Sequence, residues 1–198
     1  GITMAGQLTI RWIERDVNKF LNKLLKTKSV TYVVASDTDS IYIRLGAVVD
    51  KIFKDKSDTR KIVRIMDKFC NETIQPQIDK SFDKLAKYVN AYEQKMIMKR
   101  EVIANKGIWT AKKRYILNVY NDEGVELKQP KLKIMGIEAV KSSTPAPCRV
   151  KIKEALNVIM TKDENALIQF IEDFRKEFKS LPPHEIAFPR SCNNLKKY

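Results

Sequence analysis

The segment TYVVASDTDSIYI, residues 31–43, decides the fold because it predicts a β-hairpin. Two runs rich in β-branched and aromatic residues, Thr31–Ala35 and Ser40–Ile43, flank the polar tetrapeptide SDTD. Val, Ile, Thr and Tyr favour strands, whereas Ser and Asp favour turns. We therefore expect two antiparallel strands whose connecting turn carries two carboxylates, those of Asp37 and Asp39.

Helical patterns lie on both sides of the expected hairpin. Residues 3–25 carry apolar side chains at steps of three and four, which is one face of a helix. A second helix is expected to start at Ser57 or Asp58, either of which could cap it, and a third follows Pro76. Extended runs are expected at residues 96–104 and 108–120, followed by a turn at 121–124 and further strands at 125–127 and 131–134. This order predicts an α/β (α+β) fold in which an antiparallel sheet carries helices packed on one face.

The character of the sequence changes after residue 138. Residues 142–147, SSTPAP, are small or proline and are typical of a domain boundary. Two amphipathic helices are expected beyond it, at residues 149–160 and 163–178. We therefore expect a sheet-containing domain at residues 1–140 and a mostly helical segment at 141–198.

An excess of positive charge restricts the classes of partner. Lys and Arg number 38 against 24 Asp and Glu, a formal net charge of +14. Such a surplus favours a polyanionic partner, with nucleic acid as the first candidate, although a soluble basic protein without one has the same composition. The basic residues are spread along the chain rather than gathered on one amphipathic helix, and no apolar run is long enough to cross a bilayer. We therefore expect no membrane partner.

The cysteines and the histidine argue against two kinds of site. Cys70, Cys148 and Cys192 are widely spaced and odd in number, no Cys-x-x-Cys occurs, and the one histidine is His184. Neither a disulfide framework nor a structural zinc site fits this pattern. A reducing cytoplasm is therefore the expected compartment.

The two aspartates of the turn suggest a metal site. Carboxylates placed two residues apart on a tight turn repel each other unless a cation lies beside them. Mg²⁺ prefers hard oxygen ligands and is usually held by one or two carboxylates plus substrate phosphates. Two such ions can activate an attacking hydroxyl and stabilise a leaving oxygen. The alternative is a purely structural turn, because Asp and Ser are common turn residues.

The tetrapeptide KKRY, residues 112–115, lies inside the strand expected at 108–120. Alternation along a strand places Lys113 and Tyr115 on one face, roughly 6–7 Å apart, and Lys112 and Arg114 on the other. A lysine beside a phenol can contact a phosphate and pack against a sugar. The alternative is a solvated basic strand without a ligand.

Three motifs in register resemble those of family B DNA polymerases, most closely the polymerases of T-even-like bacteriophages. ASDTDSIY, at residues 35–42, is similar to the Asp-Thr-Asp-Ser motif at the centre of the palm domain. KKRY at 112–115, with KLKIMGIE at 131–138 and SSTP at 142–145, resembles the segment that closes the palm and leads into the thumb. Three motifs in the right order are more specific than any one alone, and the resemblance runs from about residue 2 to residue 178.

The resemblance implies roles for individual residues. Asp39 would be the principal ligand of the catalytic metals and Asp37 an accessory one. Glu101 would be a third acidic residue near the metal site, or else an exposed strand glutamate. Ser36 stands where close relatives usually have Gly, and Ser adopts positive φ less readily, so the turn geometry is expected to depend on this position. The side chains expected to contact duplex DNA are those of the basic tetrapeptide, Lys112, Lys113, Arg114 and Tyr115.

The resemblance also implies a larger enzyme. Residues 1–140 would be most of the palm and 141–198 the start of a truncated thumb. Family B palms take a further metal-binding aspartate from a strand before the fingers, and the fingers hold the incoming nucleotide. Neither element is recognised in this sequence, and nor is the 3′–5′ exonuclease domain. The expected partner is therefore a polypeptide that supplies exonuclease, fingers and the rest of the palm.

The resemblance implies that the complete enzyme extends a primer-template DNA with deoxynucleoside triphosphates by template-directed transfer. It would use two Mg²⁺ ions, which Mn²⁺ could replace, in the cytoplasm of a bacterial host. The chain alone is expected to be inactive, and a sheet edge left uncovered would favour self-association. Two alternatives stay open: an Asp-x-Asp glycosyltransferase, and a non-catalytic DNA-binding or assembly module.

Overall fold

The structure, a computed structural model, describes residues 1–191 and 193 and divides into two compact units. The first unit consists of Gly1–Asn105 and Val119–Gln129. The second consists of Lys106–Asn118 and the chain from Pro130 onward. The division therefore differs from the expected segments 1–140 and 141–198, because residues 106–118 and 130–140 belong with the C-terminal helices.

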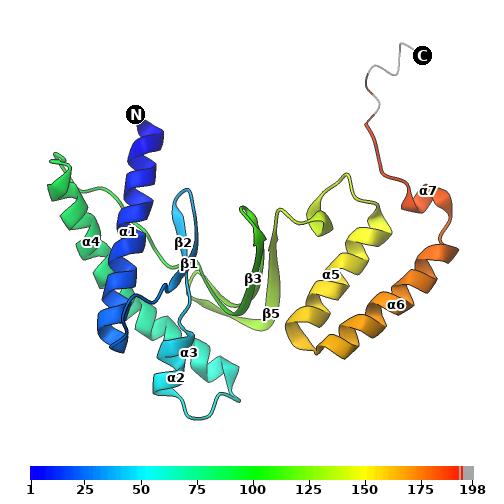
Figure 1. Ribbon diagram of the computed structural model, residues 1–198, viewed down its shortest axis with the longest axis horizontal. Coiled ribbons are helices and arrows are strands. Elements are labelled where there is room, and N and C mark those ends of the chain that lie inside the picture. Colours follow the sequence, from blue (N-terminus) through cyan, green and yellow to red (C-terminus); the bar gives the residue numbers. More distant parts are fainter. Residues whose placement is uncertain (192, 194–198) are drawn as a thin grey trace. The chain divides into compact units, whose positions relative to one another are not determined.

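Two long helices form the framework of the first unit, α1 at Ile2–Leu25 and α4 at Gln75–Tyr88. They pack side by side, as Figure 1 shows. Helix α1 buries residues at steps of four, Ile13, Val17, Leu21 and Leu25, so the periodicity that predicted it also identifies its core face. A polar contact joins the two helices as well, since Ser81 donates to Asp16 at 2.7 Å.

The expected second and third helices are confirmed, but they form one continuous rod. Helix α3, Thr59–Phe69, is capped by Asp58, whose side chain accepts from the Lys61 N–H at 2.9 Å. A π-helical turn at Cys70–Ile74 then leads directly into α4. Pro76 lies in the first turn of α4 and has no N–H to donate to the carbonyl four residues earlier, so the helix widens where that bond is missing. A short helix that the sequence did not predict, α2, spans Gly46–Ile52.

The strands are antiparallel, which confirms the expected fold class, and they form two sheets. One is the predicted hairpin, β1 at Val33–Asp37 and β2 at Ser40–Ile43. The other has the order β3-β4-β5, with β3 at Val102–Ala111, β4 at Arg114–Asp122 and β5 at Val125–Met135. The run expected at residues 96–104 is extended strand only from residue 102.

The turn predicted at residues 121–124 is present but shorter, because β4 continues to Asp122 and only Glu123 and Gly124 connect it to β5. Its central residues, Glu123 and Gly124, have φ of 48° and 91°. Positive φ at both central positions is the geometry that matches the twist of a two-residue hairpin. Buried Asn121 supports the turn, because its Oδ1 accepts from the Gly124 N–H at 3.0 Å.

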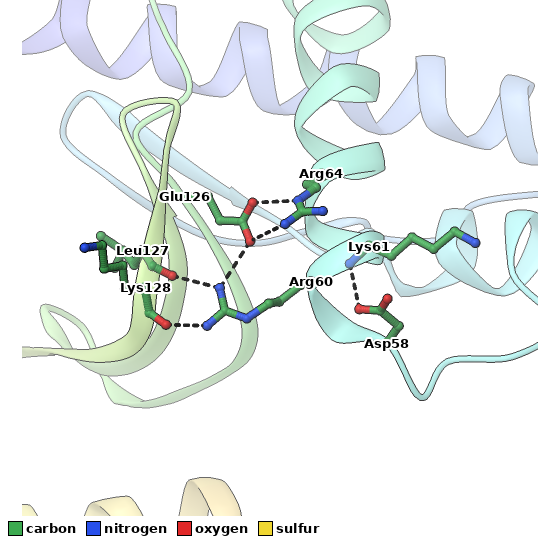
Figure 2. Close-up of polar contacts among 7 residues, drawn as sticks. All are labelled: Asp58, Arg60, Lys61, Arg64, Glu126, Leu127 and Lys128. Atoms are coloured by element: carbon green, nitrogen blue, oxygen red, sulfur yellow. Dashed lines mark hydrogen bonds and ion pairs between the residues drawn. The ribbon is translucent and has the colours of Figure 1, made fainter.

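Within the first unit an ion-pair cluster fastens α3 to β5 (Figure 2). Arg64 donates to both carboxylate oxygens of Glu126, and Arg60 donates to the same carboxylate at 3.1 Å. Arg60 also donates to the backbone oxygens of Leu127 and Lys128. Hydrogen bonds from the two guanidinium groups lower the pKa of the Glu126 carboxyl. The fork of donors on Arg60 thus holds two successive carbonyls of the strand.

The second unit contains the two predicted C-terminal helices. Helix α5 spans Ala146–Thr161, starting inside the proline-rich stretch, and α6 spans Glu164–Ser180. They pack against each other (Figure 1), and Lys151 of α5 bridges to Glu177 of α6 at 2.9 Å. A 3₁₀ turn at Glu138–Val140 precedes them, and the short helix α7 follows at Pro183–Ile186. The buried core of this unit comprises Ile116, Ile137, Ala139, Leu156 and Met160.

The state of the cysteines and the character of the helices bear on two further expectations. Cys70 and Cys148 are free thiols, and Cys192 lies outside the described residues. Among the described residues, no helix combines the length and the apolar character that a membrane span requires.

Candidate functional site

Two asparagines of α1 hold the chain that enters β1. Asn18 Oδ1 accepts from the backbone N–H groups of Tyr32 and Val33, at 2.7 and 3.0 Å. Asn22 both donates to and accepts from the backbone of Val30, at 2.7 and 2.9 Å. Because residues four apart share a face of a helix, the two amides form one polar ladder along α1. The base of the aspartate hairpin is therefore fixed to a long helix with one buried face, and two asparagines four residues apart are the feature of the sequence that could have indicated it.

The two aspartates lie at the tip of the β1–β2 hairpin, as predicted. Asp37 is the last residue of β1 and pairs with Ser40 of β2, while Asp39 lies in the turn between them. Asp37 is half-buried and its carboxylate accepts from the Thr38 hydroxyl at 3.1 Å, whereas Asp39 is exposed. The hydroxyl of Ser40 donates to the Asp37 carbonyl at 3.1 Å and closes the turn. The two aspartates, two residues apart in the chain, thus both lie at the tip of the hairpin, and Asp39 is exposed to solvent there.

The turn geometry does not depend on Ser36 in the way the sequence suggested. Ser36 lies within β1 and pairs with Ile41, and the residue with positive φ is Thr38, at 41°. A β-branched residue in this region of backbone space is unusual and stores strain. A register irregularity between Val33 and Ala35 also leaves Val34 as an extra residue in β1, a bulge of the kind often found near functional sites.

The carboxylates of this hairpin suit a hard divalent cation. One or two carboxylates, completed by water and substrate phosphates, is the usual protein share of a Mg²⁺ site. Among the described residues, no three His, Cys, Asp or Glu side chains come together as a complete metal-ligand group. Glu101, just before β3, is exposed, and its carbonyl accepts from the Glu123 N–H at 2.6 Å. The structure thus brings Asp37 and Asp39 to one tip but does not add Glu101 to them as a third member of such a group.

The basic tetrapeptide does not lie wholly within a strand, which corrects the sequence prediction, because only Arg114 and Tyr115 belong to β4. Lys112 and Lys113 form the two-residue turn between β3 and β4, and Lys113 has a φ of 61°. The alternation expected for residues 112–115 therefore does not apply across the turn. Nothing in the tetrapeptide signals a turn, because it lacks Gly, Asn, Asp and Pro. Both lysine side chains are exposed at the end of the hairpin.

The other two residues of the tetrapeptide are engaged within the second unit. Arg114 Nη2 donates to both carboxylate oxygens of Glu138, at 2.5 and 2.6 Å. Tyr115 is buried, and its ring lies 6.3 Å from that of Trp109 on β3. The pKa of the Glu138 carboxyl is lowered, first by its own backbone N–H and then by Lys141 and Arg114. The lysine side chains are therefore exposed at the turn. Arg114 and Tyr115, the first two residues of β4, hold the start of that strand through Glu138 and Trp109.

Comparison with known proteins identifies relatives along the entire chain. No family model matches. The chain is 41% identical to the DNA-directed DNA polymerase of Escherichia phage RB69 and 36% identical to that of Enterobacteria phage T4, in both cases over 100% of its length. Over its whole length the chain is therefore similar to one segment of two T-even-type phage DNA polymerases. It spans 23% of the length of each of these relatives.

Proposed function

We propose that this chain supplies part of the catalytic centre of a phage DNA-directed DNA polymerase. The observation that carries the proposal is the end-to-end similarity to two T-even-type polymerases at 41% and 36% identity. The proposed reaction is template-directed transfer of deoxynucleotides to a primer end in the cytoplasm of an infected bacterium. The rest of the palm, the fingers and the exonuclease would come from the remainder of the polymerase.

In this proposal the β1–β2 hairpin contributes carboxylates to a two-metal centre. Asp39, exposed in the turn, is the principal ligand. Asp37, which is half-buried and accepts a hydrogen bond from the Thr38 hydroxyl, is an accessory one. Mg²⁺ or Mn²⁺ bound there would activate the primer hydroxyl and stabilise the leaving oxygen. Glu101 is a further candidate ligand, supported by sequence resemblance alone. The Asn18 and Asn22 contacts fix the hairpin base, so the two carboxylates are positioned before any ligand binds.

The β3–β4 turn contributes the proposed contact with primer-template DNA. Lys112 and Lys113 are exposed at its tip, and lysines in such a position neutralise phosphates without reading sequence. Arg114 and Tyr115 support that turn from inside the unit. The net charge of +14 favours the same partner through long-range attraction.

The DNA contact is tested by salt titration of binding to a fluorescent primer-template duplex. We expect binding without sequence preference, with a log–log salt slope of about −0.9 per phosphate neutralised. Lys113→Ala should reduce the magnitude of that slope by about one and weaken binding about threefold to tenfold. Lys80→Ala, an exposed lysine on α4, removes the same charge and should leave the slope near that of the wild type. A wild-type slope in Lys113→Ala would reject this turn as the DNA contact.

A further inference from the structure

The β3–β4 turn is in close contact with a second turn, at Gly136, just after β5. Gly136 has a φ of 65°, and a Cβ built on it would overlap the backbone oxygen of Lys113. The same Cβ would lie 3.1 Å from Cγ of Arg114. Because backbone atoms cannot swing aside as a flexible side chain does, only glycine lets the two turns approach this closely. The backbone of Lys113 is therefore located by the backbone at Gly136.

A set of ion pairs holds the same two segments from the other side. Arg114 binds the Glu138 carboxylate through Nη2, and Lys141 lies 3.2 Å from one oxygen of that carboxylate. The Nε of Arg114 is buried, with no hydrogen-bond partner among the described residues. The inner part of this side chain is therefore covered by the protein, although the side chain as a whole remains half-exposed. Glu138 thus fixes the residue that immediately follows Lys113.

These two contacts explain why a lysine occupies the left-handed region in a turn without glycine or asparagine. Lys113, at a φ of 61°, is not Gly, Asn or Asp, the residues that adopt this conformation most readily. A strained backbone persists when the surrounding structure over-determines it. Here the surroundings include Gly136, against the Lys113 carbonyl, and the Arg114–Glu138 pair at the next residue.

We infer that Gly136 and Glu138 are positioning residues for the DNA contact, which they hold by fixing the Lys113 carbonyl and Arg114, the residue that follows it. The inference rests on the proposed function of the β3–β4 turn and adds residues that do not themselves touch DNA. The ligand is a phosphate of duplex DNA. Fixing the turn keeps the Lys113 ammonium where it reaches the phosphate, so loss of either positioning contact removes one neutralised phosphate without removing the lysine.

The test uses the full chain and the same primer-template titration. Gly136→Ala should reduce the salt slope by about 0.9, as Lys113→Ala does, although it removes no charge. The matched control is Gly124→Ala. Gly124 also has positive φ, 91°, but its added Cβ would meet only Arg100 Nη2 at 3.8 Å. Both substitutions strain a turn, and only Gly136→Ala displaces Lys113, so a wild-type slope in Gly124→Ala separates positioning from general destabilisation.

A second variant keeps the inference testable if Gly136→Ala does not fold. Glu138→Gln keeps the size of the side chain and makes the protein more positive by one charge. Simple electrostatics then predicts tighter DNA binding, whereas loss of positioning predicts weaker binding, by about threefold to tenfold. Glu172→Gln, on the exposed face of α6, removes the same charge and should leave binding unchanged or slightly tighter.

The double variant Lys113→Ala/Gly136→Ala separates the inference from the function on which it rests. If Gly136 acts through Lys113, the double variant binds like Lys113→Ala alone. Wild-type slopes in Gly136→Ala and Glu138→Gln, with a reduced slope in Lys113→Ala, overturn the inference and leave the DNA contact standing. A wild-type slope in Lys113→Ala overturns the DNA contact and the inference together.

Discussion

Asp37 and Asp39 occupy different environments at one hairpin tip, and the difference suits different roles. Asp37 ends a strand, is half-buried and accepts a hydrogen bond from Thr38. Asp39 lies exposed in the turn, where a metal ion can approach with its water and phosphate ligands. The strained Thr38 between them, at a φ of 41°, fixes the relation of the two backbones.

Removing the two carboxylates in turn should therefore have unequal effects on metal binding. Asp39→Asn should weaken Mn²⁺ binding by about tenfold or more, because even residues that only support a metal ligand have effects of this size. Asp37→Asn should weaken it less, since Asp37 is partly committed to the turn. Binding is measured by the electron paramagnetic resonance signal of free Mn²⁺, with Asp163→Asn, the exposed cap residue of α6, as control. Equal Mn²⁺ affinity in Asp39→Asn and the wild type would contradict the assignment.

At the scale of elements, two helices begin with the same capping device in different units. Asp58 caps α3 by accepting from the Lys61 N–H, and Asp163 caps α6 by accepting from the Ala166 N–H, both at 2.9 Å. Loss of an N-cap typically costs about 1 kcal/mol, because a backbone N–H at the helix start loses its partner. The cost should appear in the unit that contains the helix.

Hydrogen exchange measured by mass spectrometry tests this expectation. Asp58→Ala should raise the amide exchange rate in residues 59–69 by about fivefold, because a loss of about 1 kcal/mol changes the opening equilibrium by that factor. The exchange rate in α6 should stay unchanged. Asp163→Ala should do the reverse, so each variant is the control for the other. Equal acceleration in both helices for either variant would show that the two units open together.

The same elements show which parts of the fold are readable from sequence. Helix α1 was predicted because its buried residues recur at helical spacing, and α3 because Asp58 is a good cap. The β3–β4 turn was missed because its conformation is set by a contact with Gly136, more than twenty residues later in the chain. The β1–β2 tip was found because β-branched runs flank its aspartates. Local rules therefore predicted the aspartate hairpin, whereas a tertiary contact determines the conformation of the β3–β4 turn.

At the scale of the whole molecule, the chain has surfaces that suit a larger assembly. It spans 23% of each T-even-type relative. The N-terminal half of α1 exposes Ile2 at 94% and Met4 at 67%, and Tyr88 and Tyr92 near the end of α4 are exposed at 71% and 104%. All four lie in the first unit, and large exposed apolar side chains can contribute to an interaction surface. The strands β1 and β2 also form a sheet of only two strands, so each has an outer edge that its own sheet does not pair.

We therefore expect the isolated 198-residue chain to bind primer-template DNA without extending it. Two-metal transfer needs carboxylates that bridge both ions and a separate contact with the triphosphate, and Asp37 and Asp39 supply only part of the first. Gel-based extension with Mg²⁺ or Mn²⁺ should show no product. Sedimentation velocity should show self-association that grows with concentration, because the sheet edges and the apolar side chains of α1 and α4 can pair between copies.

Adding a polypeptide that carries the exonuclease, the fingers and the rest of the palm should restore extension and suppress self-association together, since one partner would complete the metal centre and cover the exposed surfaces. The matched control mixes the same partner polypeptide with the Asp39→Asn chain. This mixture should still suppress self-association but yield no extension product. Template-directed incorporation by the pure chain would show that a complete metal centre lies within residues 1–198. Restored extension with unchanged self-association would place the partner on a different surface from the one that pairs between copies.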